Sequence, residues 1–365
     1  MWPVLCWIWI EILVLPFFKH IDLENDRPLL AAALMVKDET STVAITIKSL
    51  SEFGVKRLFV FDTGSTDGTQ ELVRQLALEY NIDLKLKEGK FVNFAVSRNE
   101  LLKFAQHRSD WLLLLDSGEE LRVDNSSAEM SVKNLLQSTK ACSFDMKQQW
   151  DLVTFFNNRL IRNNGDFYYV FPVHEYITTD NEKCKNQNWD EHKPVLPKVC
   201  IFQNRTLTGH SSAARWIKDA QVLQDVVNRD PTEPRGLFYL ANTLSQLGNE
   251  SGAIPFYERR YRVVDRGWWE EREVSLIFMI RSMLKVNRFA DAYIWALRLY
   301  YDHSRIEGLY DVAVASDESV CVGLVSLACR AETPTRYLFI DYTYYEKLRW
   351  DLKKDCFSKF ISKNK

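Results

Sequence analysis

Residues Phe61–Thr69 read FDTGSTDGT, and this stretch decides how the fold of the chain is interpreted. It closes an apolar run, Val55–Phe61, that is typical of a buried parallel strand. Apolar residues recur at helical spacing from Leu72 onward, which predicts a helix directly after the turn. Ligands of open α/β sheets bind at the carboxyl ends of strands, so we expect Asp62 to point into a ligand crevice. A purely structural turn uses the same Ser, Thr, Asp and Gly residues, so this stretch alone leaves both interpretations open.

Strands and helices alternate over roughly the first 120 residues. The predicted strands are Leu29–Val36, Val55–Asp62, Ile82–Leu86 and Trp111–Asp116, of which Ile82–Leu86 alternates as an edge strand does. The predicted helices are Ser41–Phe53, Asp67–Tyr80 and Phe94–Gln106. Such alternation predicts a parallel sheet with helices on both of its faces.

After about residue 120 the alternation stops. Residues 122–139 are polar and are expected to form loops or a short helix. Four further strands are predicted after them, at Cys142–Trp150, Val153–Ile161, Tyr168–Ile177 and Val195–Phe202. The first half of the chain is therefore expected to hold a mixed sheet.

From Ser211 onward the pattern is wholly helical, beginning with a helix at Ala213–Val227. One set of residues matches the spacing of a tetratricopeptide helix pair: Leu237, Leu240, Ala241, Leu244, Gly248, Ala253 and Tyr257. A weaker second unit follows 39 residues later, where Ile280, Ala292 and Ala296 correspond to Ala241, Ala253 and Tyr257. A short solenoid is predicted, and a generic helical bundle is the alternative.

These patterns divide the chain into four parts. Residues 1–27 are an apolar N-terminal extension, 28–210 the α/β domain, 211–330 the helical domain and 331–365 a C-terminal segment. Within the last part, Tyr337–Ile340 is a candidate strand and Tyr344–Phe360 a predicted amphipathic helix.

Composition limits the classes of function. The chain of 365 residues is long enough for two domains, and its apolar fraction of 46% is that of a globular protein. A formal charge of −2 argues against nucleic acid as a partner, since nucleic-acid-binding proteins usually carry a basic excess. The seven cysteines are scattered and form no C-x-x-C pair, so we expect reduced thiols and a cytoplasmic location. Residues 2–18 are almost all apolar and could associate with a membrane, although Glu11 and Pro16 interrupt them.

Five motifs in order support a specific resemblance. They are Met35–Glu39 (MVKDE), Phe61–Thr69, Ser97–Glu100 (SRNE), Trp111–Glu119 (WLLLLDSGE) and Pro172–Tyr176 (PVHEY). Together they resemble family 2 glycosyltransferases, enzymes of the GT-A fold, over about residues 28–180. The resemblance implies a GT-A-like Rossmann-type mixed sheet, followed here by the tetratricopeptide-like helical domain.

The resemblance also implies an activity, the transfer of a sugar from a nucleotide-sugar donor to an acceptor hydroxyl. The donor would be UDP-linked, and the acceptor a glycan, lipid or polypeptide. In the family, residues matching Asp38, Glu39 and Asp62 hold the uracil ring and ribose. Arg98 and Asn99 are expected near the same crevice, where the fork of the arginine suits a phosphate or a carboxylate. The helical domain would bind the acceptor, a protein partner or a second copy of the chain.

The metal motif departs from the family pattern. Asp116 matches the first aspartate of the D-x-D motif, but its third position, usually the direct ligand, is Gly118. Asp116, Glu119 and His174 together could still supply ligands for Mn²⁺ or Mg²⁺ if the loop is shifted. Without such a shift we expect weak metal binding or none.

The sequence offers more than one candidate for the general base and more than one function. Glu175, Asp151 and Asp166 are all candidates for the base of an inverting reaction, which is the outcome that the resemblance suggests. His210, at the domain boundary, is expected to serve as a hinge or packing residue. The alternative function is a degenerate glycosyltransferase fold that acts as a binding scaffold through its helical repeats. A nucleotidyltransferase fits less well, because no Gly-rich, Lys-bearing phosphate loop is present.

Overall fold

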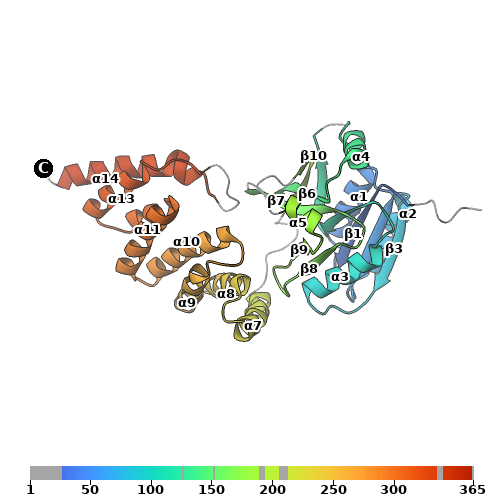
Figure 1. Ribbon diagram of the computed structural model, residues 1–365, viewed down its shortest axis with the longest axis horizontal. Helices are drawn as coiled ribbons and strands as arrows, with labels where there is room; N and C mark the ends of the chain where they lie inside the picture. Colours follow the sequence, from blue (N-terminus) through green and yellow to red (C-terminus); the bar gives the residue numbers. More distant parts are fainter. Residues whose placement is uncertain are drawn as a thin grey trace, which may run out of the picture.

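The computed structural model describes residues 27–363 except 125–126, 151–152, 189–193, 205–212 and 335–339. Figure 1 shows an α/β part followed by a wholly helical part, which extends away from it toward the C-terminus. The predicted fold class, a mixed sheet followed by helices, is confirmed.

The sheet has eight strands in the order β3-β2-β1-β4-β7-β6-β10-β5. Their bounds are β1 Leu30–Val36, β2 Arg57–Asp62, β3 Asp83–Glu88, β4 Trp111–Asp116, β5 Glu119–Val123, β6 Ser143–Trp150, β7 Val153–Arg162 and β10 Val195–Gln203. The strands β3, β2, β1 and β4 are parallel, while β7 runs antiparallel to β4 and to β6. As predicted, Ile82–Leu86 falls at an edge of the sheet, in β3.

Both faces of the parallel strands are buried, which explains their continuous apolar sequences. Alternate residues of β1 enter two different cores. Ala32 and Leu34 pack with α1 (Val43–Glu52) and α2 (Thr69–Glu79), while Ala31 and Ala33 pack with α3 (Phe94–Ala105). The sheet is therefore a rigid layer whose strand ends are fixed in space.

The strand register places the candidate site. On one side of β1, Val36 pairs with Asp62 at the end of β2. On its other side, Met35 pairs with Asp116 at the end of β4. The two aspartates therefore lie at the same carboxyl edge of the sheet, separated by one strand, as the alternating pattern predicted.

Three parts of the α/β region differ from the expectation. Tyr168–Ile177 is not one strand but two, β8 (Phe167–Val170) and β9 (Tyr176–Thr179), which form a separate two-stranded sheet. The backbone between them is left-handed at Phe171 (φ 82°) and His174 (φ 56°), so a single strand cannot continue through it. Neither β5 (Glu119–Val123) nor α5 (Glu182–Asn188) was predicted, whereas α4 (Ala128–Ser138) is the short helix expected within residues 122–139.

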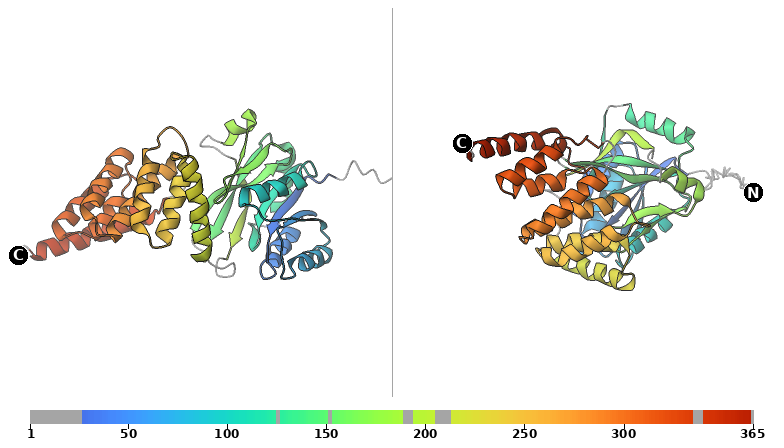
Figure 2. Two further views of the ribbon diagram at one scale, coloured as in Figure 1. Left: turned by 90° about the horizontal axis from the view of Figure 1, so that it is seen from below. Right: turned by 60° about the vertical axis from the view of Figure 1, so that its left-hand side comes forward.

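The helical part is built mainly from antiparallel neighbours (Figure 2). Its elements are α7 Ala213–Arg229, α8 Pro234–Gln246, α9 Glu250–Arg262, α10 Trp269–Lys285, α11 Phe289–His303, α12 Glu307–Val314, α13 Glu318–Ala328, the π-helical turn η1 Tyr344–Leu348 and α14 Arg349–Lys363. The small residues Ala241, Ala253, Ala292 and Ala296 are completely buried where helices meet, as their spacing predicted. A tetratricopeptide character of these helices stays a prediction. The candidate strand Tyr337–Ile340 lies largely outside the described residues.

The cysteines correct the expectation of reduced thiols. Cys142 is joined to Cys184, and Cys321 to Cys356, as disulfides. Partners 42 and 35 residues apart carry no sequence signature, because tertiary packing alone brings them together. Cys200 and Cys329 are free thiols, as expected.

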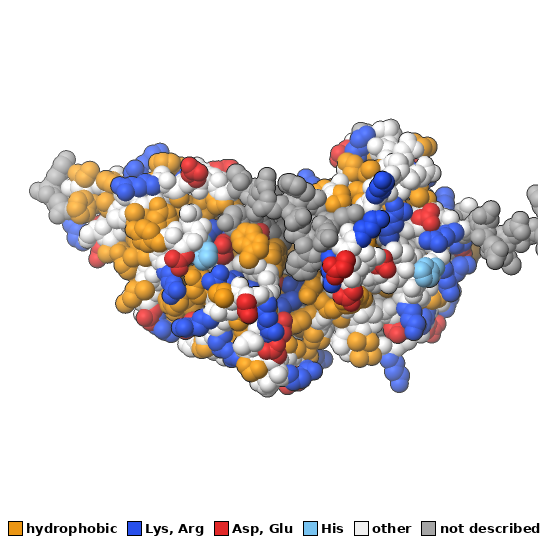
Figure 3. Space-filling view, in the orientation of Figure 1, with side chains coloured by type: hydrophobic (Ala, Val, Ile, Leu, Met, Phe, Trp, Pro, Cys, Tyr) orange, Lys and Arg blue, Asp and Glu red, His pale blue; other side chains and the backbone are white. Residues whose placement is uncertain are grey.

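No helix among the described residues is long and apolar enough to cross a membrane. The apolar residues 2–18 and the hinge candidate His210 lie outside the described part of the chain. On the face drawn in Figure 3, acidic and basic side chains are interspersed and hydrophobic side chains gather over the helical part.

The Cys142–Cys184 disulfide should contribute substantially to stability. It closes a 42-residue loop between β6 and α5, and constraining such a loop in the unfolded chain stabilises a protein by about 2–4 kcal/mol. Changing both residues to Ala should lower the free energy of unfolding in urea by about that amount. The matched control is Cys200→Ala, which removes a cysteine outside both disulfides. The pairing would be contradicted if the double variant were as stable as the parent and a non-reducing digest of the parent held no peptides linked through Cys142 and Cys184.

Candidate functional site

The loops that follow β1 and β2 are joined to each other at the carboxyl edge of the sheet. The hydrogen bonds that connect them include Lys37 Nζ to the Gly64 carbonyl (2.9 Å), Asp38 N to Ser65 Oγ (2.9 Å), Glu39 N to Thr69 Oγ1 (2.7 Å) and Thr40 N to Asp67 Oδ2 (3.1 Å). The Ser, Thr and Asp side chains of the FDTGSTDGT stretch thus fix the preceding motif. These contacts are those of a structural turn, and they involve the residues after Asp62. They do not account for the buried carboxylate of Asp62 itself.

Asp62 is completely buried at the end of β2. Its Oδ1 accepts hydrogen bonds from the backbone N–H groups of Gly64 and Ser65, both at 2.8 Å. Burial opposes ionisation, but hydrogen bonds from Ser65 and Gly64 hold the pKa of Asp62 below its usual value. Its Oδ2 is buried and makes no hydrogen bond of ordinary geometry among the described residues, although the Gln70 side chain also helps to lower the pKa of Asp62. An unpaired buried acceptor is costly, so Asp62 is suited to receive a donor group of a ligand.

Asp38 and Glu39 are held by their own neighbours. Asp38 has a left-handed backbone (φ 55°), and its Oδ1 accepts from the Thr66 N–H at 2.7 Å. The carboxylate of Glu39 accepts from the Thr42 hydroxyl. Both acids therefore shape the loop beside Asp62 in this structure.

Asp116 is held by two arginines. Its Oδ1 accepts from Arg98 Nη2 at 2.6 Å, and its Oδ2 accepts from Arg159 Nη1 and Nη2 at 3.3 Å. The two guanidinium groups outweigh the effect of burial and keep the pKa of Asp116 well below its usual range. Arg98 projects from α3, which begins after Asn93, whose side chain caps the helix by accepting from the Val96 N–H.

Arg159 is the site residue that sequence reasoning missed. It projects from β7 and is only 8% exposed, between the half-buried carboxylate of Asp116 and the buried carboxylate of Glu119. The available signal was an arginine directly before two apolar residues, Leu160 and Ile161, within a predicted strand. A charged residue at such a position must find a counter-charge, which identifies it as a partner of the acidic motif.

Glu119 lies beneath the strand ends. Its Oε2 accepts from the Asp116 N–H at 2.8 Å, and its Oε1 accepts from Gln148 Nε2 at 3.0 Å and Arg159 Nη2 at 2.8 Å. Burial raises the pKa of Glu119 to about 7, although Arg159 opposes the shift. Gly118 precedes it with a φ of 82°, a conformation in which an aspartate would be strained.

His174 and Asn99 are occupied elsewhere. The ring of His174 stacks on Tyr239 of α8, with centroids 3.9 Å apart, and burial lowers its pKa to about 4, so it is neutral at pH 7. The side chain of Asn99 exchanges two hydrogen bonds with the backbone of Tyr169, at 2.7 and 2.8 Å, and holds β8 against α3.

The described residues do not assemble the predicted metal ligands. Asp116 is paired with arginines, Glu119 faces the interior and His174 lies against Tyr239. Within the described part of the chain, no group of three or more His, Cys, Asp or Glu side chains is placed to hold a metal ion. The donor set as folded therefore does not fit a divalent cation.

The candidate bases lie in different places. Glu175 is close to the aspartate cluster, because its Oε1 accepts from Arg98 Nε at 2.6 Å. Asp166 lies in the turn before β8, where it accepts from Asn164 and Asn181, both at 2.7 Å. Asp151 lies outside the described residues.

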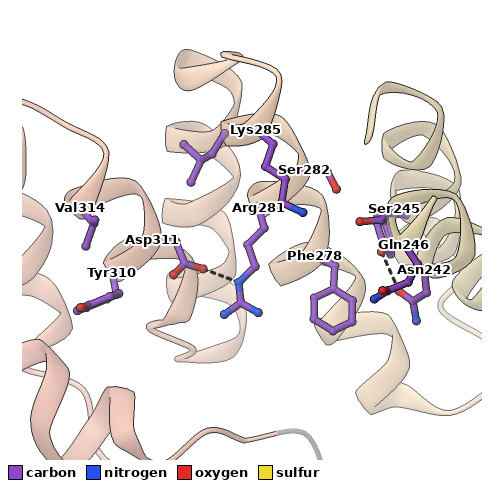
Figure 4. Close-up of a pocket in the computed structure, with 12 residues that line it drawn as sticks. Asn242, Ser245, Gln246, Phe278, Arg281, Ser282, Lys285, Tyr310, Asp311 and Val314 are labelled. Atoms are coloured by element: carbon purple, nitrogen blue, oxygen red, sulfur yellow. Dashed lines mark hydrogen bonds and ion pairs between the residues drawn. The ribbon is translucent and has the colours of Figure 1, made fainter. Parts of the chain in front are cut away.

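A separate hollow lies in the helical part (Figure 4). It has a volume of about 530 Å³ and opens between α8, α10 and α12. Its charged side chains are already paired, Arg281 with Asp311 at 2.7 Å and Lys285 with Glu250. It shares no residue with the cluster around Asp116.

Comparison with known proteins agrees with this geometry. Residues 33–189 match the family model described as glycosyl transferase family 2. No curated protein matches the chain significantly. Solved structures of S. aureus TarS resemble this chain, with low sequence identity and low TM-scores. TarS 1–349 in complex with UDP-GlcNAc has 14% identity and a TM-score of 0.37, covering 69% of this chain and 81% of that one. TarS 1–349 alone has 11% identity and a TM-score of 0.37, covering 91% of both chains. We infer nothing about this chain from that similarity.

The match to glycosyl transferase family 2 is confined to residues 33–189, and it confirms the predicted class of enzyme, a glycosyltransferase. The matched residues include every predicted donor-site residue from Asp38 to Glu175.

The raised pKa of Glu119 predicts a dependence of stability on pH. A carboxyl whose pKa rises from 4.5 to about 7 on folding stabilises the protein at low pH, and this contribution is lost as the pH rises through 7. Glu119→Gln removes the titration. The difference in unfolding free energy, variant minus parent, should therefore rise from about pH 5 to about pH 7, by at most about 1.4 kcal/mol per pH unit, and level off above that.

Urea unfolding at several pH values measures this difference. Glu120→Gln is the control, because Glu120 is the neighbouring residue in β5 and is an exposed partner of Arg122. A Glu119→Gln difference that stays constant from pH 5 to 8 would show that Glu119 is ionised throughout this range.

Proposed function

We propose that the chain transfers a sugar from a UDP-linked donor to an acceptor hydroxyl with inversion, at the carboxyl ends of β1, β2 and β4. One observation carries the proposal. Asp62 offers a buried, unpaired acceptor one strand away from the Arg98–Asp116 pair, within the residues that match glycosyl transferase family 2. The uracil ring of a donor has an N–H that suits Asp62, and its diphosphate suits a guanidinium.

The reaction forms one bond and breaks another. The acceptor oxygen attacks the anomeric carbon of the sugar from the face opposite the diphosphate, while the bond from that carbon to the phosphate oxygen breaks. The electron pair of the broken bond leaves with UDP, and the proton of the acceptor passes to a carboxylate. We propose Glu175 or Asp151 for that carboxylate, and Asp38, Glu39, Asn99 and Asp116 as the remaining wall of the donor site.

Arg98 is proposed to stabilise the leaving diphosphate. Its Nε and Nη2 are held by Glu175 and Asp116, which orients the guanidinium. Its Nη1 has no partner among the described residues. A fixed guanidinium with a free donor stabilises developing negative charge without reorganising during the reaction. A divalent metal would supply the same stabilisation, but the ligands described above do not fit one.

A second candidate function is a scaffold that retains the domain without its chemistry. The observation that favours it is the replacement of the usual carboxylate by Gly118, together with the pairing of Asp116 by two arginines. In this alternative the helical part carries the function, as a binding surface for a partner. We propose the boundary between the two domains at about residue 210 in either case.

Asp62→Ala should weaken the binding of UDP about 5- to 150-fold. The substitution removes the acceptor and leaves a donor of the ligand unpaired, which costs about 1–3 kcal/mol. Isothermal calorimetry with UDP measures the change. Asp110→Ala is the matched control. Asp110 lies just before the amino end of β4, at the other end of the strand from Asp116, and its side chain is exposed. Equal UDP affinity in the parent and in Asp62→Ala would remove Asp62 from the donor site.

Removing divalent metal should change the affinity for UDP less than replacing Arg98 does. We expect less than a twofold difference between EDTA and 1 mM Mn²⁺ in the parent, since no ligand set is in place. Arg98→Lys should weaken binding at least tenfold in both conditions, because lysine cannot keep the two-carboxylate geometry. A loss of UDP binding in EDTA alone would show that the site rearranges to take a metal ion.

UDP-sugar hydrolysis separates the two candidate functions. The enzyme should release UDP slowly in the absence of acceptor, and Arg98→Lys should abolish the release. UDP binding without any turnover, for donors that carry several different sugars, would favour the scaffold.

A further inference from the structure

The segment 171–175 connects the cluster around Asp116 with the helical part. It contains two residues with left-handed backbone, Phe171 and His174. Non-glycine residues in this conformation are strained, and they persist only where their surroundings hold them. The contacts that hold this segment therefore matter for the position of Glu175.

Helix α8 supplies those contacts. Arg235, in its first turn, donates to the carbonyl of His174 from Nε at 3.0 Å and from Nη2 at 2.7 Å. The ring of Tyr239, one turn later, stacks on the ring of His174. Val173 belongs to one buried apolar cluster with Leu237 and Leu240 of the same helix and with Leu223 and Val227 of α7. Backbone, ring and apolar side chain of the segment thus all contact α8, while α3 holds the carbonyl of Pro172 through the Phe94 N–H at 3.2 Å.

Arg235 is itself fixed from the far side. Its Nη1 donates to Glu271 Oε1 of α10 at 2.6 Å, and the Glu271 side chain is only 1% exposed. Burial raises the pKa of Glu271, and Arg235 opposes this shift. The carboxylate of Glu271 and the carbonyl of His174 together engage all three nitrogens of the Arg235 guanidinium. A lysine has a single nitrogen and could not make both sets of contacts in this geometry.

On the opposite side of the segment, Glu175 holds Arg98, and Arg98 holds Asp116, each at 2.6 Å. The contacts therefore run without a break from Glu271 in the helical part, through Arg235 and the strained segment, to the end of β4. Each link is a charged hydrogen bond or a single peptide step.

We infer that Arg235 is a positioning residue of the donor site, so that the helical part completes the site by setting Glu175 and, through it, the guanidinium of Arg98. The inference rests on the proposed function for its effect on donor binding. Arg235 acts through the strained segment and touches neither Arg98 nor Asp116 in any described contact.

The test uses the full chain with Arg235→Met combined with Glu271→Gln. The pair is removed together because Arg235→Met alone would leave Glu271 buried without its partner and could unfold the protein. The matched control is Arg262→Ala combined with Glu258→Gln, which removes an exposed ion pair within the neighbouring helix α9. Circular dichroism and thermal melting establish that both variants fold.

The first measurement needs no ligand. Hydrogen exchange should quicken in residues 167–177 and in α3 around Arg98 in the Arg235 variant, and should stay unchanged there in the control. Unchanged exchange in α3 would overturn the inference, whatever the chain binds.

The second measurement is UDP affinity by calorimetry. We expect the Arg235 variant to bind at least fivefold more weakly than the control. Combining it with Arg98→Lys should weaken binding by clearly less than the product of the two separate effects, because both changes disturb one arrangement. Multiplicative effects would show that Arg235 and Arg98 act independently and would overturn the inference. If the parent fails to bind UDP at all, the proposed donor is wrong, and the exchange measurement alone decides the positioning role.

Discussion

The pairing of Asp116 with Arg98 is the interaction on which the rest of the site depends. The parallel register of β1, β2 and β4 brings Asp62 and Asp116 to the carboxyl ends of the two strands that flank β1, where the half-buried carboxylate of Asp116 is stabilised by a counter-charge. Arg98 supplies it from α3, and Arg159 supplies a second from β7. The orientation of Arg98 in turn depends on Glu175, and the position of Glu175 depends on the helical part. The two parts of the chain therefore meet at a functional element.

This arrangement gives a physical reason for the altered acidic motif. A carboxylate at position 118 would add a like charge between Asp116 and Glu119, and like charges close together disfavour ionisation. Glycine at that position relieves the charge and allows a left-handed backbone whose N–H binds Thr46. The motif is thus coherent as an arginine-neutralised cluster, which is how the proposed function uses it.

The fold could be predicted from the sequence to a large extent, and the site only in part. Continuous apolar strands such as Leu30–Val36 and the turn after Asp62 are local signals, so the parallel sheet and the end positions of both aspartates followed from them. The partners of these residues could not be predicted, since Arg159, Tyr239 and Arg235 approach from distant parts of the chain. The same reason explains the missed disulfides and the single strand predicted at Tyr168–Ile177, where tertiary contacts hold a strained backbone that local propensity opposes.

The most direct test of this account is a crystal structure of the chain with UDP bound, grown in the presence of EDTA. The account predicts UDP at the carboxyl ends of β1, β2 and β4, with a uracil N–H donated to Asp62 Oδ2 and a diphosphate oxygen accepting from Arg98. Glu175 should keep its contact with Arg98. UDP bound elsewhere, for example in the hollow between α8, α10 and α12, or a diphosphate held away from Arg98, would contradict it.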